Sequence, residues 1–245
     1  MDGVLIIDKP SGISSFDVLR DLKRKLPERK MGYLGTLDPL ATGVLVVFLG
    51  KATQLIPYFS EAPKEYKVQF ELGKTSDTYD TLGKVIENTF TPPDEGTIEE
   101  HAQSFLGQQW QIQPPFSAVR YKGKRAYEYA RKGEAIDLGK RQVIFFEITL
   151  LTYKPPLVEM RILCSSGTYI RSFVHELGQK LGCGAVMASL RRTRVGTFMV
   201  EQAKKLEDIS PHDLLSPQKI IAESIDWKGR SQNEKSVLLQ KFSSI

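Results

Sequence analysis

The residues best placed for chemistry form the segment Gly35-Thr36-Leu37-Asp38-Pro39-Leu40-Ala41-Thr42-Gly43. It holds one acid, Asp38, ahead of the apolar run Val44 to Leu49, whose length and valine content predict a buried strand. Pro39 disfavours helical geometry for Asp38, and the glycines allow the backbone to approach a ligand closely. A carboxylate held on such a turn can act as a nucleophile or a base. Asp-Pro is also an ordinary helix start with Asp38 as N-cap, so the motif alone leaves both interpretations open.

The elements around this segment follow from local signals. Residues 4 to 7 predict a short strand that ends in a turn, Asp8 to Gly12. Ser14 and Asp17 predict a capping box for a helix that runs to about Leu26. That helix and the next residues are basic, which indicates either an approach for an anion or a solvated helix face; the cations are Arg20, Lys23, Arg24, Lys25, Arg29 and Lys30. A short helix is expected from Ala52 to Phe59.

The rest of the chain alternates strands and helices irregularly. Alternation over Tyr66–Leu72 predicts a half-buried strand, with which Lys84–Glu87 is expected to pair. The longest strand candidates are Val143–Tyr153 and Leu157–Cys164. Two helices are expected to be capped by Thr97 and Thr168, and the second has one apolar face formed by Ile170, Phe173, Val174, Leu177 and Leu181. The pattern predicts an α+β fold with a mixed, largely antiparallel sheet flanked by helices.

Charge is unevenly distributed along the chain. The formal net charge is +5, and residues 111–141 alone carry eight basic residues against three acidic ones. Residues 177–200 contain no acid but include Lys180, Arg191, Arg192 and Arg194, whereas residues 61–100 are acidic. This polarity favours an anionic partner, and nucleic acid in particular.

The strongly basic segment, residues 111–142, is predicted to be an insertion and not part of the hydrophobic core. Within it, Tyr121, Tyr127 and Tyr129 alternate with lysines and arginines. Bases stack on tyrosine rings while cations meet phosphates, so the composition suits an RNA-gripping arm, although a basic surface hairpin would look the same.

Arg171 gives an independent clue. It falls in the first turn of its predicted helix, where the helix dipole disfavours a cation. We expect a compensating anion, either a carboxylate such as Asp38 or a phosphate, although a solvated arginine would carry the same signature.

Other features argue against several classes of protein. No apolar run approaches the roughly 20 residues that span a bilayer, and the N-terminus does not resemble a secretory signal. The two cysteines and three histidines are dispersed, so we expect free thiols and no metal site. The expected location is the cytoplasm.

Several segments together resemble one family, the TruB-type tRNA pseudouridine-55 synthases. In chain order they are Asp8-Lys9-Pro10-x-Gly12, Gly35 to Gly43, Lys64-x-Tyr66, Leu72-Gly73 with Thr75 to Gly83, Gln113-Pro114-Pro115-Phe116-Ser117-Ala118, Gly167 to Arg171, Leu181 to Ala185 and Leu190-Arg191-Arg192. They span residues 4 to about 197, and an ordered set of this kind is very specific.

The resemblance implies a site and a reaction. Asp38 would be the catalytic residue, Tyr66 would stack on the extruded uracil, Arg171 would pair with Asp38, and Tyr169 and Leu190 would line the pocket. The family isomerises one uridine of the tRNA T arm by flipping it out, with neither cofactor nor metal. It further implies tRNA as partner, no membrane, no guide RNA or protein partner, and a monomer.

The sequence departs from the family in two places. The family usually has histidine in the context Gly-His-x-Gly, whereas this chain has Gly32-Tyr33-Leu34-Gly35, so Tyr33 is expected to contact RNA by stacking. Family members commonly carry a further RNA-binding domain; here we expect a catalytic domain, residues 1–200, and only a short extension, residues 201–245. An alternative function is a tRNA-binding or folding module with little catalysis. A base-cleaving hydrolase is less favoured, because that chemistry usually needs two carboxylates.

Overall fold

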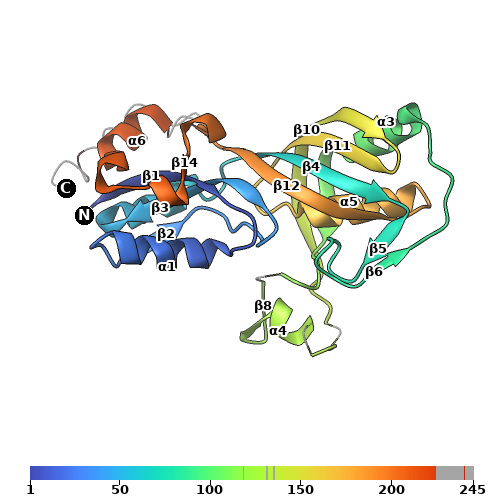
Figure 1. Ribbon diagram of the computed structural model, residues 1–245, viewed down its shortest axis with the longest axis horizontal. Coiled ribbons are helices and arrows are strands. Elements are labelled where there is room, and N and C mark those ends of the chain that lie inside the picture. The colour runs from blue at the N-terminus through green and yellow to red at the C-terminus, as the bar shows by residue number, and fades with distance from the viewer. Residues whose placement is uncertain (118, 131, 135, 225–239, 241–245) are drawn as a thin grey trace. The chain divides into compact units, whose positions relative to one another are not determined.

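The computed structural model describes residues 1–117, 119–130, 132–134, 136–224 and 240 (Figure 1). Ala118 and Arg131 of the basic insertion lie outside the described residues, as does most of the expected extension beyond residue 224. The chain divides into two compact units, one formed by Met1–Tyr66 with Arg191–Ile245 and the other by Lys67–Leu190.

The first unit is built on a sheet in the order β14-β1-β3-β12. Strands β1 (Gly3–Lys9) and β3 (Thr42–Leu49) are antiparallel, with Gly3 opposite Leu49 and Lys9 opposite Gly43. The predicted strand at residues 44–49 is therefore confirmed, and every residue of it is buried. Strand β12 (Ala185–Val195) runs parallel to β3, with Arg191 opposite Thr42.

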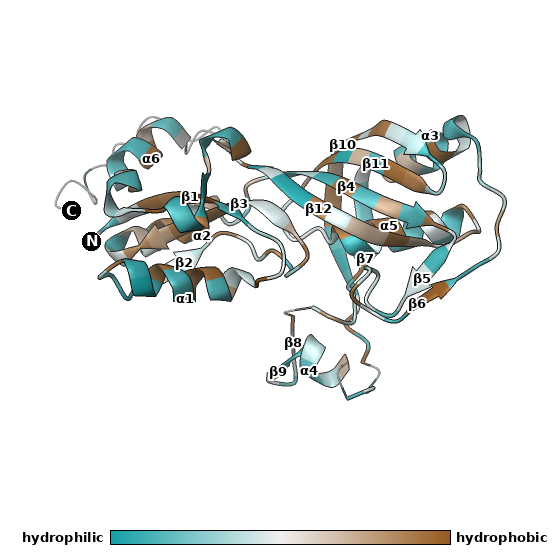
Figure 2. Ribbon diagram, viewed as in Figure 1, coloured by the Kyte–Doolittle hydropathy of each residue, from teal (hydrophilic) through white to brown (hydrophobic). Residues whose placement is uncertain are grey.

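Short strands complete this sheet. They are β2 (Met31–Tyr33), which pairs with β3, β13 (Phe198–Met199), which pairs with β12, and β14 (Lys204–Lys205), which pairs with β1. Figure 2 shows the apolar residues concentrated on β1 and β3, where Val4, Val44, Val46 and Phe48 belong to the core cluster of this unit.

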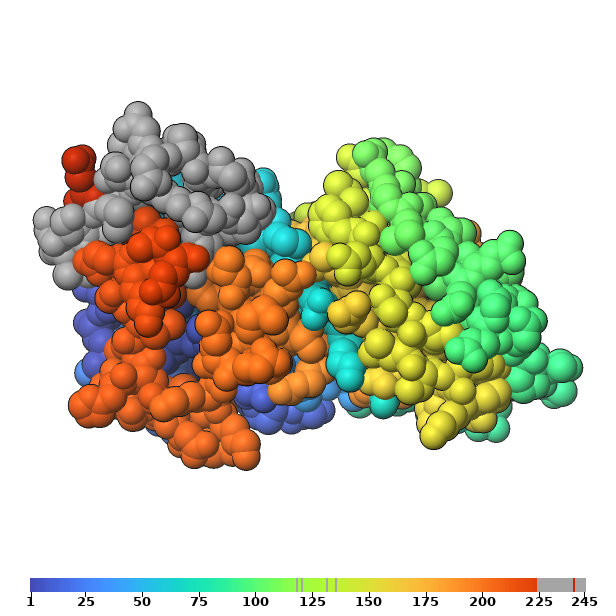
Figure 3. All heavy atoms as spheres, turned by 90° about the horizontal axis from the view of Figure 1, so that it is seen from above, coloured from blue at the N-terminus to red at the C-terminus, as the bar shows by residue number. Residues whose placement is uncertain are grey.

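Helix α1 (Ser15–Lys25) begins at a capping box formed by Ser14 and Asp17, as predicted, and ends before Pro27. The remaining helical segments of the unit are η1 (Gly50–Leu55), α2 (Ile56–Phe59), η2 (Val200–Gln202), η3 (Leu206–Asp208), η4 (Pro211–Asp213) and α6 (Pro217–Ser224). The helix expected from Ala52 to Phe59 is thus a 3-10 helix up to Leu55 and becomes α-helical from Ile56. Figure 3 shows the N-terminal residues, in blue, beside those after residue 191, in orange, which together form this unit.

The second unit contains a sheet in the order β12-β4-β11-β10-β7. Its strands are β4 (Lys64–Leu72), β7 (Gly107–Ile112), β10 (Lys140–Lys154) and β11 (Leu157–Cys164), and the pairs β10–β11 and β10–β7 are antiparallel. Helices α3 (Glu95–Gln103), α4 (Ala126–Ala130) and α5 (Ile170–Lys180) complete it. The predicted α+β class and mixed, largely antiparallel sheet are confirmed.

Strand β6 (Val85–Glu87) pairs with β5 (Lys74–Ser76) in a separate two-stranded sheet, so its predicted pairing with Tyr66–Leu72 is wrong. The loop between β5 and β6 explains the difference. Asp77 accepts the amide of Lys84 at 2.8 Å, and Asp80 accepts that of Leu82 at 3.0 Å. These hydrogen bonds close a local hairpin between β5 and β6. Pairing of β6 with β4 would require them to break.

Two predicted helix caps are also wrong. The N-cap of α3 is Asp94, whose carboxylate accepts the amide of Thr97 at 2.9 Å. The N-cap of α5 is Tyr169, and the hydroxyl of Thr168 donates to the carbonyl of Ser165 instead. Across the described part of the chain, no helix combines the length and the apolar character needed to cross a membrane.

Candidate active site

Asp38 lies in a turn, not at a helix start. The amide of Ala41 donates to the carbonyl of Asp38 at 3.0 Å, and the chain then enters β3. Gly35 and Gly43 at the two ends of this loop have φ of +67° and +97°. The competing interpretation of Asp38 as a helix N-cap is therefore wrong, because the positive φ at Gly43 turns the chain into a strand.

The start of α1 holds this loop by hydrogen bonds. The buried Ser15 hydroxyl accepts the amide of Leu37 at 2.9 Å and donates to its carbonyl at 3.1 Å. One residue beyond Asp38, the carbonyl of Pro39 accepts the amide of Gly12 at 2.8 Å. The backbone on both sides of Asp38 is thus fixed, while the Asp38 residue itself is half-buried.

Lys9 is a buried cation that contacts the same turn. Its ammonium donates to the carbonyls of Pro10 at 2.8 Å, Ile13 at 2.6 Å and Pro39 at 3.4 Å, and the residue has no solvent exposure. Burial lowers the pKa of Lys9 to about 8, and the negative charge of Asp38 opposes that shift. Lys9 therefore interacts electrostatically with Asp38. In the sequence, Lys9 stood out only as part of a matched motif.

Arg192 braces both ends of the loop from β12. This side chain is fully buried; its Nε donates to the carbonyl of Val44 at 2.8 Å, and its Nη2 donates to the carbonyls of Gly35 at 3.0 Å and Leu34 at 3.4 Å. Burial lowers the pKa of Arg192, and hydrogen bonding to the side chain of Tyr66 opposes that shift. Arg192 thus connects the Asp38 loop with Tyr66, which is only 6% exposed.

This placement corrects part of the charge argument made from the sequence. Arg192 is buried in the interior. Arg191 forms two hydrogen bonds with the carboxylate of Asp8, at 2.7 and 3.0 Å. Arg194 lies 3.9 Å from Glu65. Within this acid-free run Arg192 is therefore unavailable to an anionic partner, whereas Arg191 and Arg194 are paired with carboxylates but stay partly exposed.

Tyr33 also belongs to the first unit. It ends β2, lies opposite Val47 of β3 and is half-buried. The first unit therefore holds three of the predicted site residues, namely Tyr33, Asp38 and Tyr66.

The second unit holds the other three, of which Arg171 is the most constrained. Arg171 is 4% exposed and donates to the carbonyls of Thr78 at 2.9 Å and Phe116 at 2.8 Å. The carboxylate of Asp80, also 4% exposed, lies 3.7 Å from its Nη1. Asp80 is thus an acid that compensates the cation in the first helical turn, and the sequence analysis missed it although it lies in the matched segment Thr75 to Gly83. The pairing of Arg171 with Asp38 stays a prediction.

Tyr169 is held through its backbone by a side-chain amide. Gln111 of β7, 3% exposed, donates to the carbonyl of Tyr169 at 2.9 Å and accepts its amide at 2.8 Å. This two-point contact replaces a side-chain cap at the start of α5. Leu190, 7% exposed, lies in β12. No local signal pointed to Gln111, since an isolated glutamine is an ordinary surface residue of a strand.

The basic insertion forms a small hairpin and a short helix. Strands β8 (Arg120–Tyr121) and β9 (Lys124–Arg125) lead into α4. The rings of Tyr121 and Tyr129 meet edge to face at 5.7 Å, and Lys122 lies over Tyr121 at 5.4 Å. Lys122, Lys124 and Arg125 are exposed, so this segment combines aromatic rings and cations as the RNA-binding prediction requires.

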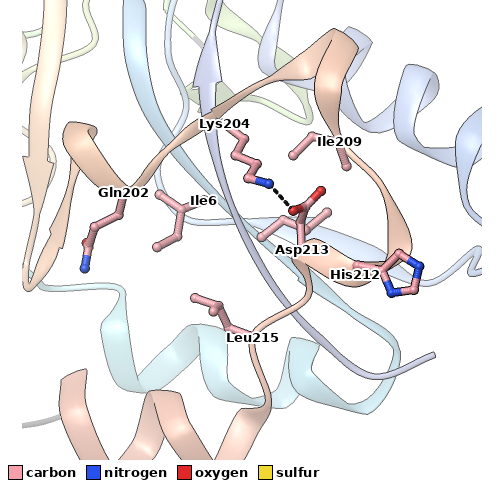
Figure 4. A pocket seen from close by; sticks show the side chains of 8 residues that line it. Ile6, Gln202, Lys204, Ile209, His212, Asp213 and Leu215 are labelled. Atoms are coloured by element: carbon pink, nitrogen blue, oxygen red, sulfur yellow. Dashed lines mark hydrogen bonds and ion pairs between the residues drawn. The ribbon is translucent and has the colours of Figure 1, made fainter.

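A separate pocket of about 250 Å³ lies on the first unit (Figure 4). It is lined by Leu5, Ile6, Gln202, Lys204, Ile209, His212, Asp213 and Leu215, and none of the predicted site residues takes part. Lys204 and Asp213 form an ion pair there, and hydrogen bonds from Lys204 and Ser210 lower the pKa of Asp213 to about 2.

Comparison with known proteins gives consistent matches. Residues 23–170 match the model of the TruB family pseudouridylate synthase N-terminal domain, and residues 171–226 match that of the tRNA pseudouridylate synthase B C-terminal domain. The tRNA pseudouridine synthase B of Clostridium acetobutylicum is 41% identical over 87% of this chain and 74% of its own length. That of Aquifex aeolicus is 42% identical over 85% of this chain and 73% of its own length.

Solved structures agree with this fold. A structure described as the archaeal box H/ACA sRNP Nop10-Cbf5 complex matches with a TM-score of 0.63 and 31% identity, covering 84% of this chain. The match spans about half of that longer chain, 52%. A Cbf5-Nop10-Gar1 complex gives a TM-score of 0.66 at 29% identity over 95% of this chain.

Proposed function

Because the chain belongs to the TruB family of pseudouridylate synthases, we propose that it converts uridine 55 in the T arm of tRNA to pseudouridine. The observation that carries this proposal is the Asp38 turn. Its backbone is fixed by Ser15 and Gly12, and two buried cations, Lys9 and Arg192, hold it from inside. A turn that only reverses the chain does not need two buried cations, which are costly to desolvate.

The isomerisation moves one bond of the nucleoside. The bond from N1 to the ribose C1′ breaks, the uracil rotates, and a new bond joins C1′ to C5. The hydrogen on C5 leaves as a proton, and N1 gains one, so the reaction needs no oxidant or reductant. A carboxylate can attack C1′, attack the base or remove a proton from the sugar, and each route begins from ionised Asp38.

The target base must leave the RNA stack before this can happen. Tyr66 supplies an aromatic surface for the flipped uracil, and its contact with Arg192 fixes it relative to the Asp38 loop. We assign Tyr169 and Leu190 to the walls of the pocket. Arg171 would orient ionised Asp38, and Asp80 would in turn hold Arg171.

The exposed cations and tyrosines of the insertion fit a role in gripping the tRNA arm. We further propose that the protein acts on tRNA as a monomer without a guide RNA or protein partner, with residues 1–200 as its catalytic part. This part of the proposal is supported by bacterial relatives whose names mention no partner, whereas the Cbf5 structures are described as complexes.

The test is tritium release from an unmodified tRNA transcript labelled at C5 of uridine, with only protein and transcript present. We expect release by the wild type that maps to uridine 55. Asp38→Asn should abolish release while leaving tRNA binding nearly intact. Absence of release by the wild type, or wild-type turnover by Asp38→Asn, would remove the assignment. Free uracil in the reaction would indicate base cleavage instead.

A further inference from the structure

Helix α1 presents an exposed aromatic ring followed by cations along one face. Phe16 is 59% exposed, and Arg20 and Arg24 follow it at intervals of four residues, so that they share one side of the helix. The opposite side, with Val18, Leu19 and Leu22, is buried. Figure 2 shows hydrophilic residues along α1 with hydrophobic residues between them.

This face begins next to the Asp38 loop. Ser15, the residue before Phe16, is the buried residue that forms two hydrogen bonds with Leu37. Leu37 precedes Asp38 directly, so one hydrogen-bonded pair of residues separates the exposed ring from the proposed catalytic residue. A nucleic acid strand that delivers its base to Asp38 therefore comes close to the start of α1.

Both arginines that follow Phe16 form exposed ion pairs, Arg24 with Asp21. Arg20 lies over the Phe16 ring at 5.7 Å, and it also pairs with Asp17 at 2.7 Å on the exposed surface. Exposed pairs of this kind contribute about 0–1 kcal/mol, so a phosphate can compete for the guanidinium. Lys25 is different, because its ammonium is committed to the carbonyls of Leu206 and Glu207 at 2.7 Å each.

We infer that this face of α1, defined by Phe16, Arg20 and Arg24, is an RNA-contact surface. A base of the substrate strand adjoining the flipped uridine stacks on Phe16, and Arg20 meets a neighbouring phosphate. The inference rests on the proposed function and extends it, since it assigns a task to the basic helix that the reaction itself does not use. An aromatic ring flanked by cations fits single-stranded RNA. A protein partner would call for a larger apolar patch than one ring.

The decisive measurement is the affinity for an unmodified tRNA transcript, determined by filter binding in the Asp38→Asn background to prevent turnover. Phe16→Ala should weaken binding about 5- to 150-fold, the range expected when a stacking aromatic is truncated. Phe16→Trp should retain binding and Phe16→Leu should not, because leucine keeps apolar area but cannot stack. Phe146→Ala, which truncates a 48% exposed ring on β10, is the matched control and should change affinity less than twofold.

A second variant tests the phosphate contact. Arg20→Ala should reduce the slope of log affinity against log salt by about 0.7–0.9, the value for one lost phosphate contact. Because both side chains are exposed, the melting temperatures of the variants should match that of the parent, which separates lost contacts from misfolding.

Two outcomes would overturn the inference. They are unchanged affinity for Phe16→Ala, and full affinity for Phe16→Leu together with an unchanged salt slope for Arg20→Ala. The second pattern would mean that neither base stacking on Phe16 nor a phosphate contact of Arg20 takes place. Wild-type tritium release on the same transcript keeps this result separate from the proposed function. If release occurs and Phe16→Ala binds normally, only the RNA-contact surface is wrong.

Discussion

The Nη2 of Arg192 lies 3.0 Å from the carbonyl oxygen of Gly35, although the two residues are 157 positions apart in the chain. The same guanidinium reaches Val44 beyond the far end of the Asp38 loop. A single buried side chain therefore sets the separation of the two ends of the segment that carries the proposed catalytic residue.

Replacing Arg192 should therefore damage turnover more than binding. In Arg192→Lys, one ammonium cannot reach the carbonyls on both sides of the loop, and misplacement by about 1 Å can cost about 100-fold in rate. We expect kcat to fall by about that factor in the tritium assay, with tRNA affinity within about threefold of wild type. The control is Leu22→Ala, a fully buried position on α1 in the same unit, which should lose about 2–5 kcal/mol of stability without a comparable fall in kcat. If Arg192→Lys and Leu22→Ala have the same melting temperature and lose the same factor in kcat, Arg192 supports only the stability of the fold.

Gly43 should not tolerate a side chain. A Cβ at Gly43 would lie 2.2 Å from the carbonyl oxygen of Arg192, and φ is +97°. Gly43→Ala should lower the free energy of unfolding by more than the roughly 1–3 kcal/mol expected from backbone strain alone. Gly12→Ala is the matched control, because Gly12 has φ of +89° but open space around it. Urea denaturation of both variants gives the comparison, and an equal loss would mean that the approach of Arg192 contributes nothing.

Gln111 should prove essential for the order of Tyr169. Gln111→Leu removes the buried acceptor of the Tyr169 amide, at about 1–3 kcal/mol, whereas the carbonyl of Tyr169 still accepts the amide of Phe173 at 3.2 Å. We expect lower stability and lower kcat, with Gln111→Glu intermediate because it retains the acceptor. Gln103→Leu, which removes a single hydrogen bond from an exposed glutamine to Ile148, should cost less than about 1 kcal/mol. If Gln111→Leu unfolds at the wild-type urea concentration, this role is wrong.

The depressed pKa of Lys9 predicts a specific pH dependence of stability. Its pKa is about 8 in the folded protein against a usual 10.5, so between these values the unfolded chain binds more protons. The free energy of unfolding should therefore rise with pH from about 8 to about 10.5 through this group, because the cost of burying a charged amine is relieved. Lys9→Met should remove that increment. Parallel curves of the unfolding free energy against pH for the two proteins would show that Lys9 titrates normally.

Tyr33 stands where the family usually has histidine, and its contribution can be measured directly. If its ring stacks on RNA, Tyr33→Ala should weaken tRNA binding or turnover by about 5- to 150-fold. Tyr33→His, which restores the usual residue of the family, should remain active. If Tyr33→Ala changes neither binding nor rate, residue 33 is not an RNA contact.

Local signals accounted for the elements that carry the site. The Ser14–Asp17 capping box, the buried strand after Gly43 and the alternating strand ending at Leu72 all depend on residues within one element. The cap of α5 was misplaced because Gln111, which is distant in sequence, binds the backbone of Tyr169. The pairing of Lys84–Glu87 was misjudged because carboxylates in the intervening loop close a local hairpin.

The sequence by itself determined that a buried strand follows the Asp38 segment, since a short valine-rich run bounded by glycines is a local signal, but it left Asp38 open between a turn and a helix start. It also determined the family, through motifs kept in order along the chain. Only the tertiary structure decided that Lys9 and Arg192 are interior cations and that Asp80 accompanies Arg171. In a sequence, each of these charged residues looks like a surface residue. Whether it is buried depends on carbonyls and carboxylates supplied by distant segments, and the desolvation that makes such contacts strong exists only once those segments have packed together.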